Sequence, residues 1–451
     1  MKGDSTLSGT IQFNQYYTFN IGGSNGAHTL NLSSATLNTV TGGAAPFIIG
    51  TGGVLNNNSG ASTMGGGGTV TLQGGSITGT SSGLFKIGDP ISGYGSISGN
   101  VDIMGSVTAA GSGQTLTVDG GSGAPLQLGN SSGSGASMGT SGGATLDLKG
   151  NLSLIQPATA NPGTGTIQLD GAHFTNAFSS SPVTINNSGL GTSGIFNVTN
   201  ASSFNNVAFS TGNGANLQVN ATLSTSNKAT INATNVTVNT GGGLNLQGNS
   251  GSTELTTKNL TMAQGSTLNV GSNSGITISG NFSYQQTAPS TAWVYNVTTG
   301  LGPDLTMTGN HVTLEAGSVN MGANAGALNN NFALNSLTLT KDAYVNVVDQ
   351  YVNATPSGWH SGVEALYLND LEGVASTTAN GDIPILNLDG LYGYVAGDPY
   401  HLVDGLYTAA DGTVLYIINA APGPVPGAGL ASLAFLAVAG AWRRARGLAA
   451  R

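Results

Sequence analysis

Residues 236–284 decide the fold, and they read VTVNTGGGLNLQGNSGSTELTTKNLTMAQGSTLNVGSNSGITISGNFSY. Short runs in this stretch alternate apolar and polar residues, and turns rich in Gly, Asn and Ser separate the runs. Alternation with a period of two places every second side chain on the same face of a strand. The stretch therefore predicts short β-strands that each bury one face.

The runs return at nearly constant intervals, in two interleaved series. In one series Leu244-Asn245-Leu246 is followed by Leu268-Asn269-Val270, and in the other Val236, Leu260 and Phe282 begin successive runs. The same alternation occurs earlier in the chain, with steps from Leu146 to Ile167 and from Phe196 to Leu217. All of these steps are about 21–24 residues long, and repeats of this length bury a face only by stacking on their neighbours.

We therefore predict an all-β protein, a parallel β-helix (β-solenoid) with rungs of about 21–24 residues. In such a stack each inner position lies about 4.8 Å from its counterpart, so a narrow core needs few apolar residues. Asn, Ser and Thr can form hydrogen-bonded ladders in the same geometry. Gly supplies the positive φ that tight corners require.

The composition supports this prediction and excludes several classes of protein. Gly alone supplies 73 of 451 residues, only 6% of residues are charged, Cys is absent and the formal net charge is −9. A typical soluble domain is about 25% charged. A nucleic-acid binder needs a basic surface, a disulfide scaffold or thiolate metal site needs Cys, and a helical bundle needs Ala, Glu, Lys and Leu at helical spacing.

A flexible linker is the alternative interpretation of a chain rich in Gly and Ser. Residues 56–62, 65–68 and 130–143 are the segments where we expect linkers. A linker would not keep its alternation at a steady spacing over such a long stretch, so the whole chain is better explained as a stacked coil.

We predict three parts, with solenoid repeats over 1–284, further rungs and a β cap over 285–420, and a sorting tail over 421–451. Most acidic residues lie after residue 300, and most tyrosines lie after residue 340. Longer apolar runs there, such as Val414–Ile418, alternate with Asp-Gly turn signals. These final strands resemble the passenger ends of autotransporter-associated β-strand repeat proteins.

An apolar run near the C-terminus predicts a hydrophobic helix. Residues 427–442 contain no charge and would span about 24 Å as a helix, enough for a thin bilayer when flanking residues are included. A buried core helix is the alternative, but the run is apolar on all sides. The side chains expected to form the span are those of Gly429, Leu430, Leu433, Phe435, Leu436, Val438 and Trp442.

All four arginines of the chain follow this run. Arg443, Arg444 and Arg446 form a basic stop, with Arg451 at the end, and they predict a cytoplasmic C-terminus. The residues that precede the span would then face outside.

The tail resembles the PEP-CTERM class of bacterial C-terminal sorting signals, which have a Val-Pro-Glu-Pro motif, a span and a basic cluster. Pro424, Val425, Pro426 and Gly427 occupy the motif, although Gly427 and Ala428 stand where the family has Glu and Pro. The resemblance implies cleavage by an exosortase-type membrane peptidase and export to the surface or into exopolysaccharide. Export needs an N-terminal signal, and residues 1–6 lack an apolar core, so we expect the true start upstream.

Other motif matches follow from composition. The G-x-G-x-x-G match at 189–194 and the G-x-S-x-G matches around Ser81 and Ser131 lack the strand and helix context that their functions require. Asp147 and Asp170 lie nearly one rung apart and could meet as a general acid and base, although turn positions are the commoner role. Glu364, Asp370 and Glu372 with His360 form an acidic cluster that we interpret as a solvated loop, with a metal site as the alternative.

Two functional hypotheses follow. The first is an exported structural or adhesive protein of the cell envelope, cell surface or extracellular matrix, with no catalytic residues, metal or cofactor. Its partners would be the membrane, the processing peptidase and extracellular glycans, and not nucleic acid. The alternative is a surface-displayed β-helix lyase or hydrolase acting on polysaccharide. A groove with two carboxylates within about 10 Å of each other, beside a Lys, would favour the enzyme.

Overall fold

The computed structural model describes residues 3–13, 18–39, 46–80, 82–123, 125–129, 135–176, 181–187, 194–212, 214–248, 252–271, 273–285, 303–320, 328, 332–351, 364–375, 383–396 and 402–419. The predicted sorting motif, membrane span and arginine cluster lie outside the described residues. Within those residues, no helix combines the length and apolar character that crossing a membrane requires.

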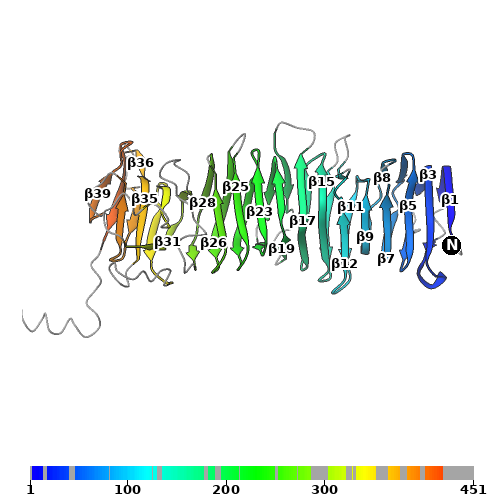
Figure 1. The fold of residues 1–451 in the computed structure, drawn as a ribbon, viewed down its shortest axis with the longest axis horizontal. Helices are drawn as coiled ribbons and strands as arrows, with labels where there is room; N and C mark the ends of the chain where they lie inside the picture. The colour runs from blue at the N-terminus through cyan, green and yellow to red at the C-terminus, as the bar shows by residue number, and fades with distance from the viewer. Residues whose placement is uncertain are drawn as a thin grey trace, which may run out of the picture.

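The described chain is almost entirely β, as predicted, and its strands belong to one sheet in which parallel pairs dominate. Figure 1 shows the strands following one another in chain order along the long axis of an elongated molecule, from blue at the N-terminal end to orange at the other. The short helix η1 (Gly23–Asn25) is a single 3-10 turn.

The strands up to residue 200 are β1 (Ser5–Phe13), β2 (Phe19–Ile21), β3 (His28–Thr39), β4 (Pro46–Gly50), β5 (Gly53–Ser59), β6 (Ser62–Gly65), β7 (Thr69–Gly79), β8 (Phe85–Ile87), β9 (Ile91–Gly99), β10 (Val101–Ile103), β11 (Ser106–Ala110), β12 (Thr115–Asp119), β13 (Leu126–Leu128), β14 (Ser137–Ser141), β15 (Thr145–Leu154), β16 (Ala158–Asn161), β17 (Thr166–Asn176), β18 (Val183–Asn186) and β19 (Ile195–Asn200). The later strands are β20 (Ser202–Asn205), β21 (Val207–Ser210), β22 (Asn216–Val219), β23 (Thr222–Ser226), β24 (Thr230–Val238), β25 (Gly243–Gln247), β26 (Thr253–Met262), β27 (Thr267–Val270), β28 (Ser274–Ile278), β29 (Phe282–Tyr284), β30 (Asp304–Met307), β31 (Asn310–Glu315), β32 (Ser318–Val319), β33 (Leu334–Leu339), β34 (Tyr344–Val348), β35 (Glu364–Glu372), β36 (Val374–Ala375), β37 (Ile385–Asn387), β38 (Tyr392–Val395), β39 (Gly405–Thr408) and β40 (Thr413–Ile418).

The intervals between the alternating runs in the sequence equal the separations between residues that pair in the sheet. Leu244 of β25 pairs with Leu268 of β27, and Leu260 of β26 pairs with both Val236 and Phe282. The two earlier intervals are also direct pairs, because Leu146 lies beside Ile167 and Phe196 beside Leu217. All of these pairings are parallel, so the periodicity identified the correct neighbours.

The predicted interval does not hold everywhere along the chain. Leu116 pairs with Leu146, and Tyr344 pairs with Ile385, and both steps are clearly longer than the predicted rung. Between Leu116 and Leu146 the described connections lie on either side of β13, where extra length costs little. The alternation therefore indicates the strands well, whereas their spacing varies with the length of the connections.

The core is built from columns of apolar side chains, one from each successive strand. One column runs through eight strands from β12 to β29, and neighbours in it are register partners about 4.8 Å apart. Its members are all buried, and they are Leu116, Leu146, Ile167, Phe196, Leu217, Val236, Leu260 and Phe282. Continuous contact along the column compensates for the small number of large apolar residues on each strand.

Phenylalanines pack together in one part of this core. The ring of Phe204 stacks on that of Phe209 with centroids 4.9 Å apart and lies 5.6 Å from that of Phe174. Phe196 meets Phe209 edge-on at 5.0 Å. Rings in such offset and edge-on contacts gain energy beyond the area that they bury.

Glycine is required where successive strands approach closely. Gly93 in β9 has φ +118°, and a Cβ atom there would lie 1.9 Å from the carbonyl oxygen of Leu72 in β7. Only a residue without a side chain fits between these strands.

The linker interpretation of the short segments is wrong where the structure describes strands. Residues 56–59 and 62 belong to β5 and β6, and residues 137–141 form β14, which pairs with β11 and β16. Residue 65 ends β6, whereas residues 66–68 form a bend and its exit, as expected for a connection. Segments rich in Asn, Ser and Gly form regular strands here because the partner strands hold them.

Antiparallel pairs occur in the C-terminal part of the described chain. β35 pairs with β32 in this sense, and β40 pairs with β36 and β39. β35 also pairs in parallel with β33 and β38, so it has both parallel and antiparallel neighbours.

We expect Phe204→Ala to lower the free energy of unfolding by about 3–5 kcal/mol, because Phe204 is 1% exposed and its ring contacts two others. Leu406→Ala is the matched control, since Leu406 is 58% exposed and its loss should cost about 0.5 kcal/mol or less. Urea unfolding followed by circular dichroism measures both. Equal effects of the two substitutions would contradict the described core.

Candidate functional site

A column of polar side chains runs beside the apolar column, one residue further along each strand. Its members pair in register from β12 to β29, and they are Thr117, Asp147, Gln168, Asn197, Gln218, Thr237, Thr261 and Ser283. Successive residues of a strand point to opposite faces. The column therefore forms a polar strip on the outer face of the sheet, in which Asp147 is covered by its neighbours and is only 5% exposed.

Asparagine ladders join neighbouring strands, as the sequence predicts. In one ladder the Asn235 amide donates to Asn216 Oδ1 at 2.8 Å, and the Asn259 amide donates to Asn235 Oδ1 at 2.8 Å. Asn281 and Thr313 extend it through backbone N–H groups, which donate to Asn259 Oδ1 and Asn281 Oδ1. Because amides both donate and accept, each Asn side chain can bond to the Asn on the strand before it and to the one on the strand after it.

Further ladders follow the same pattern. One ladder joins Asn197 to Asn220 and Asn220 in turn to Asn239. Single hydrogen bonds of the same kind join Asn31 to Asn56, Asn205 to Asn227, and Asn346 to Asn387. The ladders thus fasten adjacent strands at many points along the molecule.

Lys149 links two aspartates of the polar surface. Its Nζ lies 3.2 Å from Asp147 Oδ2 on its own strand and 2.5 Å from Asp170 Oδ2 on β17. The two carboxylates are therefore no more than about 6 Å apart, within the range of carboxylate pairs in glycosidases. The prediction that Asp147 and Asp170 could meet across rungs is confirmed in its geometry.

The surroundings of the two carboxylates differ. Burial raises the pKa of Asp147, although Lys149 and a 3.2 Å hydrogen bond from Gln168 act against the shift. The hydrogen bond from Lys149 lowers the pKa of Asp170, and Asn200 also donates to this carboxylate. Both carboxylates contact the same ammonium group, so the three residues can act as an electrostatic clamp between β15 and β17.

The interpretation of Glu364, Asp370 and Glu372 as a solvated loop is wrong, because all three lie on β35 and Glu364 is buried. The membership of the acidic cluster also differs from the prediction. Asp370 pairs with Ser336, and Glu372 accepts a hydrogen bond of 2.9 Å from Thr338 Oγ1, so both belong to the outer polar surface. His360 lies outside the described residues. Glu364 is close instead to Glu315 and Asp349, which the sequence analysis did not single out.

Glu315, Asp349 and Glu364 form a cluster of three carboxylates, which we call the carboxylate cluster. One carboxylate oxygen from each residue lies within 4.8 Å of the other two. Glu315 ends β31, Asp349 directly follows β34, and Glu364 begins β35. Glu315 pairs with Val348, the residue before Asp349, so the register of β31 and β34 brings these two acids together.

Glu315 is a buried member of the carboxylate cluster and is 6% exposed. Its Oε1 accepts hydrogen bonds from the backbone N–H groups of Gln350 and Tyr351 at 2.8 and 2.9 Å. Its Oε2 is shielded from solvent and has no hydrogen-bond partner among the described residues. Burial, with a contribution from the nearby Asp349, raises the pKa of Glu315 to about 7.

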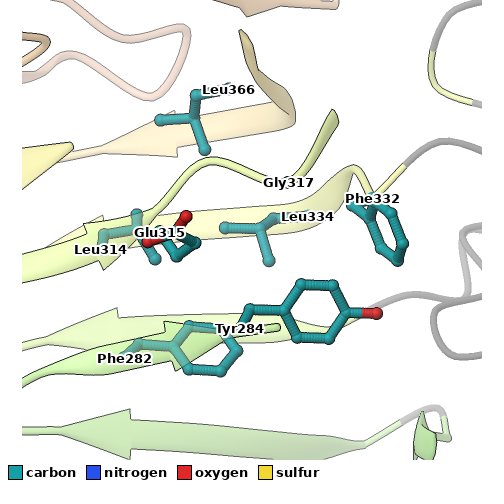
Figure 2. Close-up of a pocket in the computed structure, with 8 residues that line it drawn as sticks. All are labelled: Phe282, Tyr284, Leu314, Glu315, Gly317, Phe332, Leu334 and Leu366. Carbon is teal, nitrogen blue, oxygen red and sulfur yellow. The ribbon is translucent and has the colours of Figure 1, made fainter. Parts of the chain in front are cut away.

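A small cavity lies beside Glu315 (Figure 2). Aromatic and aliphatic side chains line it, namely those of Phe282, Tyr284, Leu314, Phe332, Leu334 and Leu366, together with Gly317. In the figure the Glu315 carboxyl group lies between its own strand and the strand that carries Leu366. A carboxylate beside an apolar cavity is poorly hydrated, which is the physical reason for its raised pKa.

Asp102 in β10 is a further buried acid, away from the carboxylate cluster. It pairs with Lys86 and Gln127, is 4% exposed, and has an Oδ1 atom without a hydrogen-bond partner in the described part of the chain. Burial raises its pKa to about 6, and the charge of Lys86 acts in the opposite direction.

Comparisons with known protein families, curated proteins and solved structures gave no match to this chain.

Asp102 should make stability depend on pH. Because its folded pKa of about 6 lies above the ordinary 3.8, its stabilising contribution is present below pH 3.8 and is lost as pH rises through about 6. Relative to Asp102→Asn, the wild type should lose up to about 3 kcal/mol of unfolding free energy between pH 4 and 7. Unfolding midpoints at several pH values measure this difference.

Lys86→Met provides the second arm, because it removes the charge that favours ionised Asp102. We expect this substitution to move the pH transition upward. A wild type and Asp102→Asn with parallel pH profiles would rule out a titrating Asp102.

Proposed function

We propose that the described strands form a parallel β-helix (β-solenoid) and that residues after about 285 cap it with a more acidic, tyrosine-rich β block. Parallel partners at a nearly constant step through much of the chain support this architecture. The antiparallel pairs near residues 364–418 support the cap, because a strand in the opposite sense interrupts further parallel stacking.

We propose that the protein is an exported structural or adhesive component of the bacterial cell surface or extracellular matrix. The observation that carries this proposal is the polar strip from Thr117 to Ser283, in which a polar side chain recurs on each paired strand at the strand spacing. Such a strip suits many weak contacts with a repeating polymer, and linked weak contacts give strong overall binding. Extracellular glycans are the partners of matching chemistry.

The C-terminal tail supplies the address in this proposal. Its apolar run over 427–442 and the following arginines would hold the chain in the membrane, and the Pro-Val-Pro-Gly segment at 424–427 would be the processing site of an exosortase-type peptidase. The low charge of the chain fits a surface with little non-specific binding.

The alternative is a β-helix enzyme that degrades polysaccharide. The carboxylates of Asp147 and Asp170, no more than about 6 Å apart beside Lys149, favour it because glycosidases use two acids at such separations. We favour the structural role, since the Lys149 ammonium group contacts both carboxylates and so engages them in ion pairs that join β15 to β17.

Deleting residues 427–451 should move the protein from the membrane fraction to the medium, because the span and its basic stop are lost together. Immunoblots of fractionated cells that express the full-length gene measure this shift. Replacing Arg443, Arg444 and Arg446 by Ala is the companion variant, and it should weaken retention while keeping the apolar run. Unchanged fractionation of the deletion variant would remove the sorting proposal.

The structural proposal predicts that the purified protein binds polysaccharide without cutting it. Acidic and neutral polysaccharides are incubated with the protein, and reducing ends and the absorbance of unsaturated products are followed. We expect no release above background. Release that Asp147→Asn and Asp170→Asn both abolish, while Asp119→Asn retains it, would establish the enzyme instead.

A further inference from the structure

The carboxylate cluster presents a problem of charge. Three carboxyl groups with oxygens within 4.8 Å of one another repel strongly when ionised, and the repulsion must be cancelled by protons or by a cation. The Asp349 carboxylate also accepts a hydrogen bond from the backbone N–H of Glu364 and is in side-chain hydrogen-bond contact with Glu364. The cluster is therefore held together by the backbone although its charges oppose it.

A second observation points to a missing partner. Glu315 is only 6% exposed, and its Oε2 atom has neither solvent nor a hydrogen-bond partner within the described residues. Backbone N–H groups of Gln350 and Tyr351 fix the other oxygen, so the orientation of the carboxylate is set. In Figure 2 the carboxyl group lies between its own strand and β35, the strand that carries Leu366. A buried carboxylate oxygen without a partner is costly unless a ligand contacts it.

The geometry points to a Ca²⁺ site: we propose that Glu315, Asp349 and Glu364 bind one calcium ion. Calcium takes oxygen ligands at about 2.3–2.6 Å, so ligand atoms on opposite sides of the ion lie about 4.6–5.2 Å apart. Because the three oxygens all lie within 4.8 Å of one another, one calcium ion can contact all of them at these bond lengths. Magnesium is the weaker candidate, because it dehydrates reluctantly and usually keeps several waters when it binds to carboxylates.

The three acids give calcium a workable set of ligands and a route of entry. Glu315 can offer Oε2, since two backbone N–H groups hold its Oε1, Asp349 and Glu364 can each offer one or both oxygens, and water completes the shell. Asp349 is exposed while Glu315 and Glu364 are buried, so the ion can enter from the side of Asp349 and be held by the inner pair. The bound ion would join β31, the end of β34 and the start of β35.

This placement gives the site a structural role. β35 is the strand that pairs in parallel with β33 and in antiparallel fashion with β32, and Glu364 itself pairs with Val319. A calcium ion at the carboxylate cluster would hold together the strands at which regular parallel pairing gives way to antiparallel pairing. Binding to the folded state alone would stabilise this junction in proportion to the logarithm of the free calcium concentration once calcium exceeds the dissociation constant.

The test uses the full-length chain, freed of metal with a chelator, and CaCl₂ as the probe. Isothermal titration calorimetry should show one Ca²⁺ per chain with a dissociation constant below about 1 mM, as in extracellular calcium modules. Thermal unfolding should shift upward by several degrees in 10 mM CaCl₂ and by less in 10 mM MgCl₂. Folded protein that gives neither binding heat nor a thermal shift would overturn the proposal.

Variants of the carboxylate cluster locate the binding. Glu315→Gln and Asp349→Asn should each weaken Ca²⁺ binding at least tenfold, and the exposed Asp349 provides a variant that keeps the fold if Glu315→Gln does not. Asp370→Asn is the matched control, because Asp370 lies on β35 outside the cluster. Equal calcium binding by Asp349→Asn and the wild type would also overturn the proposal.

Discussion

Parallel pairing in register is the constraint on which the rest of the structure depends. Each residue lies about 4.8 Å from the residue in the same position on the next strand, so every choice at one position is repeated against its neighbour. Apolar residues gain from this repetition, as the column from Leu116 to Phe282 shows, and amides gain through ladders. Like charges lose about 1 kcal/mol per pair at this distance even in water. The chain accordingly carries few charges, and Lys149 lies between two acids.

The sequence shows the features of the fold that are local. Alternation and interval identify pairs such as Leu244 with Leu268, because side-chain direction in a strand depends only on position along it. The strand at residues 53–59 escapes this pattern because its buried residue Asn57 is polar. The Asn57 amide donates to the carbonyls of Gly60 and Gly83, and its Oδ1 accepts from Ser62. The buried polar atoms of its side chain therefore all have hydrogen-bond partners. No composition rule distinguishes such a residue from one in a linker.

The candidate sites show the same division. Asp147 and Asp170 could be paired in advance because they lie close to one repeat apart in the sequence. Glu315 and Asp349 are separated in the sequence by clearly more than one repeat, and Asp349 and Glu364 by clearly less. In this part of the chain the pairing includes antiparallel strands. Acids that are brought together where the pairing changes from parallel to antiparallel do not recur at a regular interval in the sequence. Asp370 and Glu372 are close to Glu364 in the sequence, but they lie outside the carboxylate cluster.

The asparagine ladders also give the molecule a direction. In each ladder named above, the amide N–H of the later strand donates to the oxygen of the earlier one, as Asn56 does to Asn31 and Asn387 does to Asn346. Every ladder therefore presents donors toward the N-terminal end and acceptors toward the C-terminal end. The two ends of the stack differ chemically, and copies joined through these ladders would match head to tail but not head to head. Polarity along the axis thus comes from an uncharged side chain.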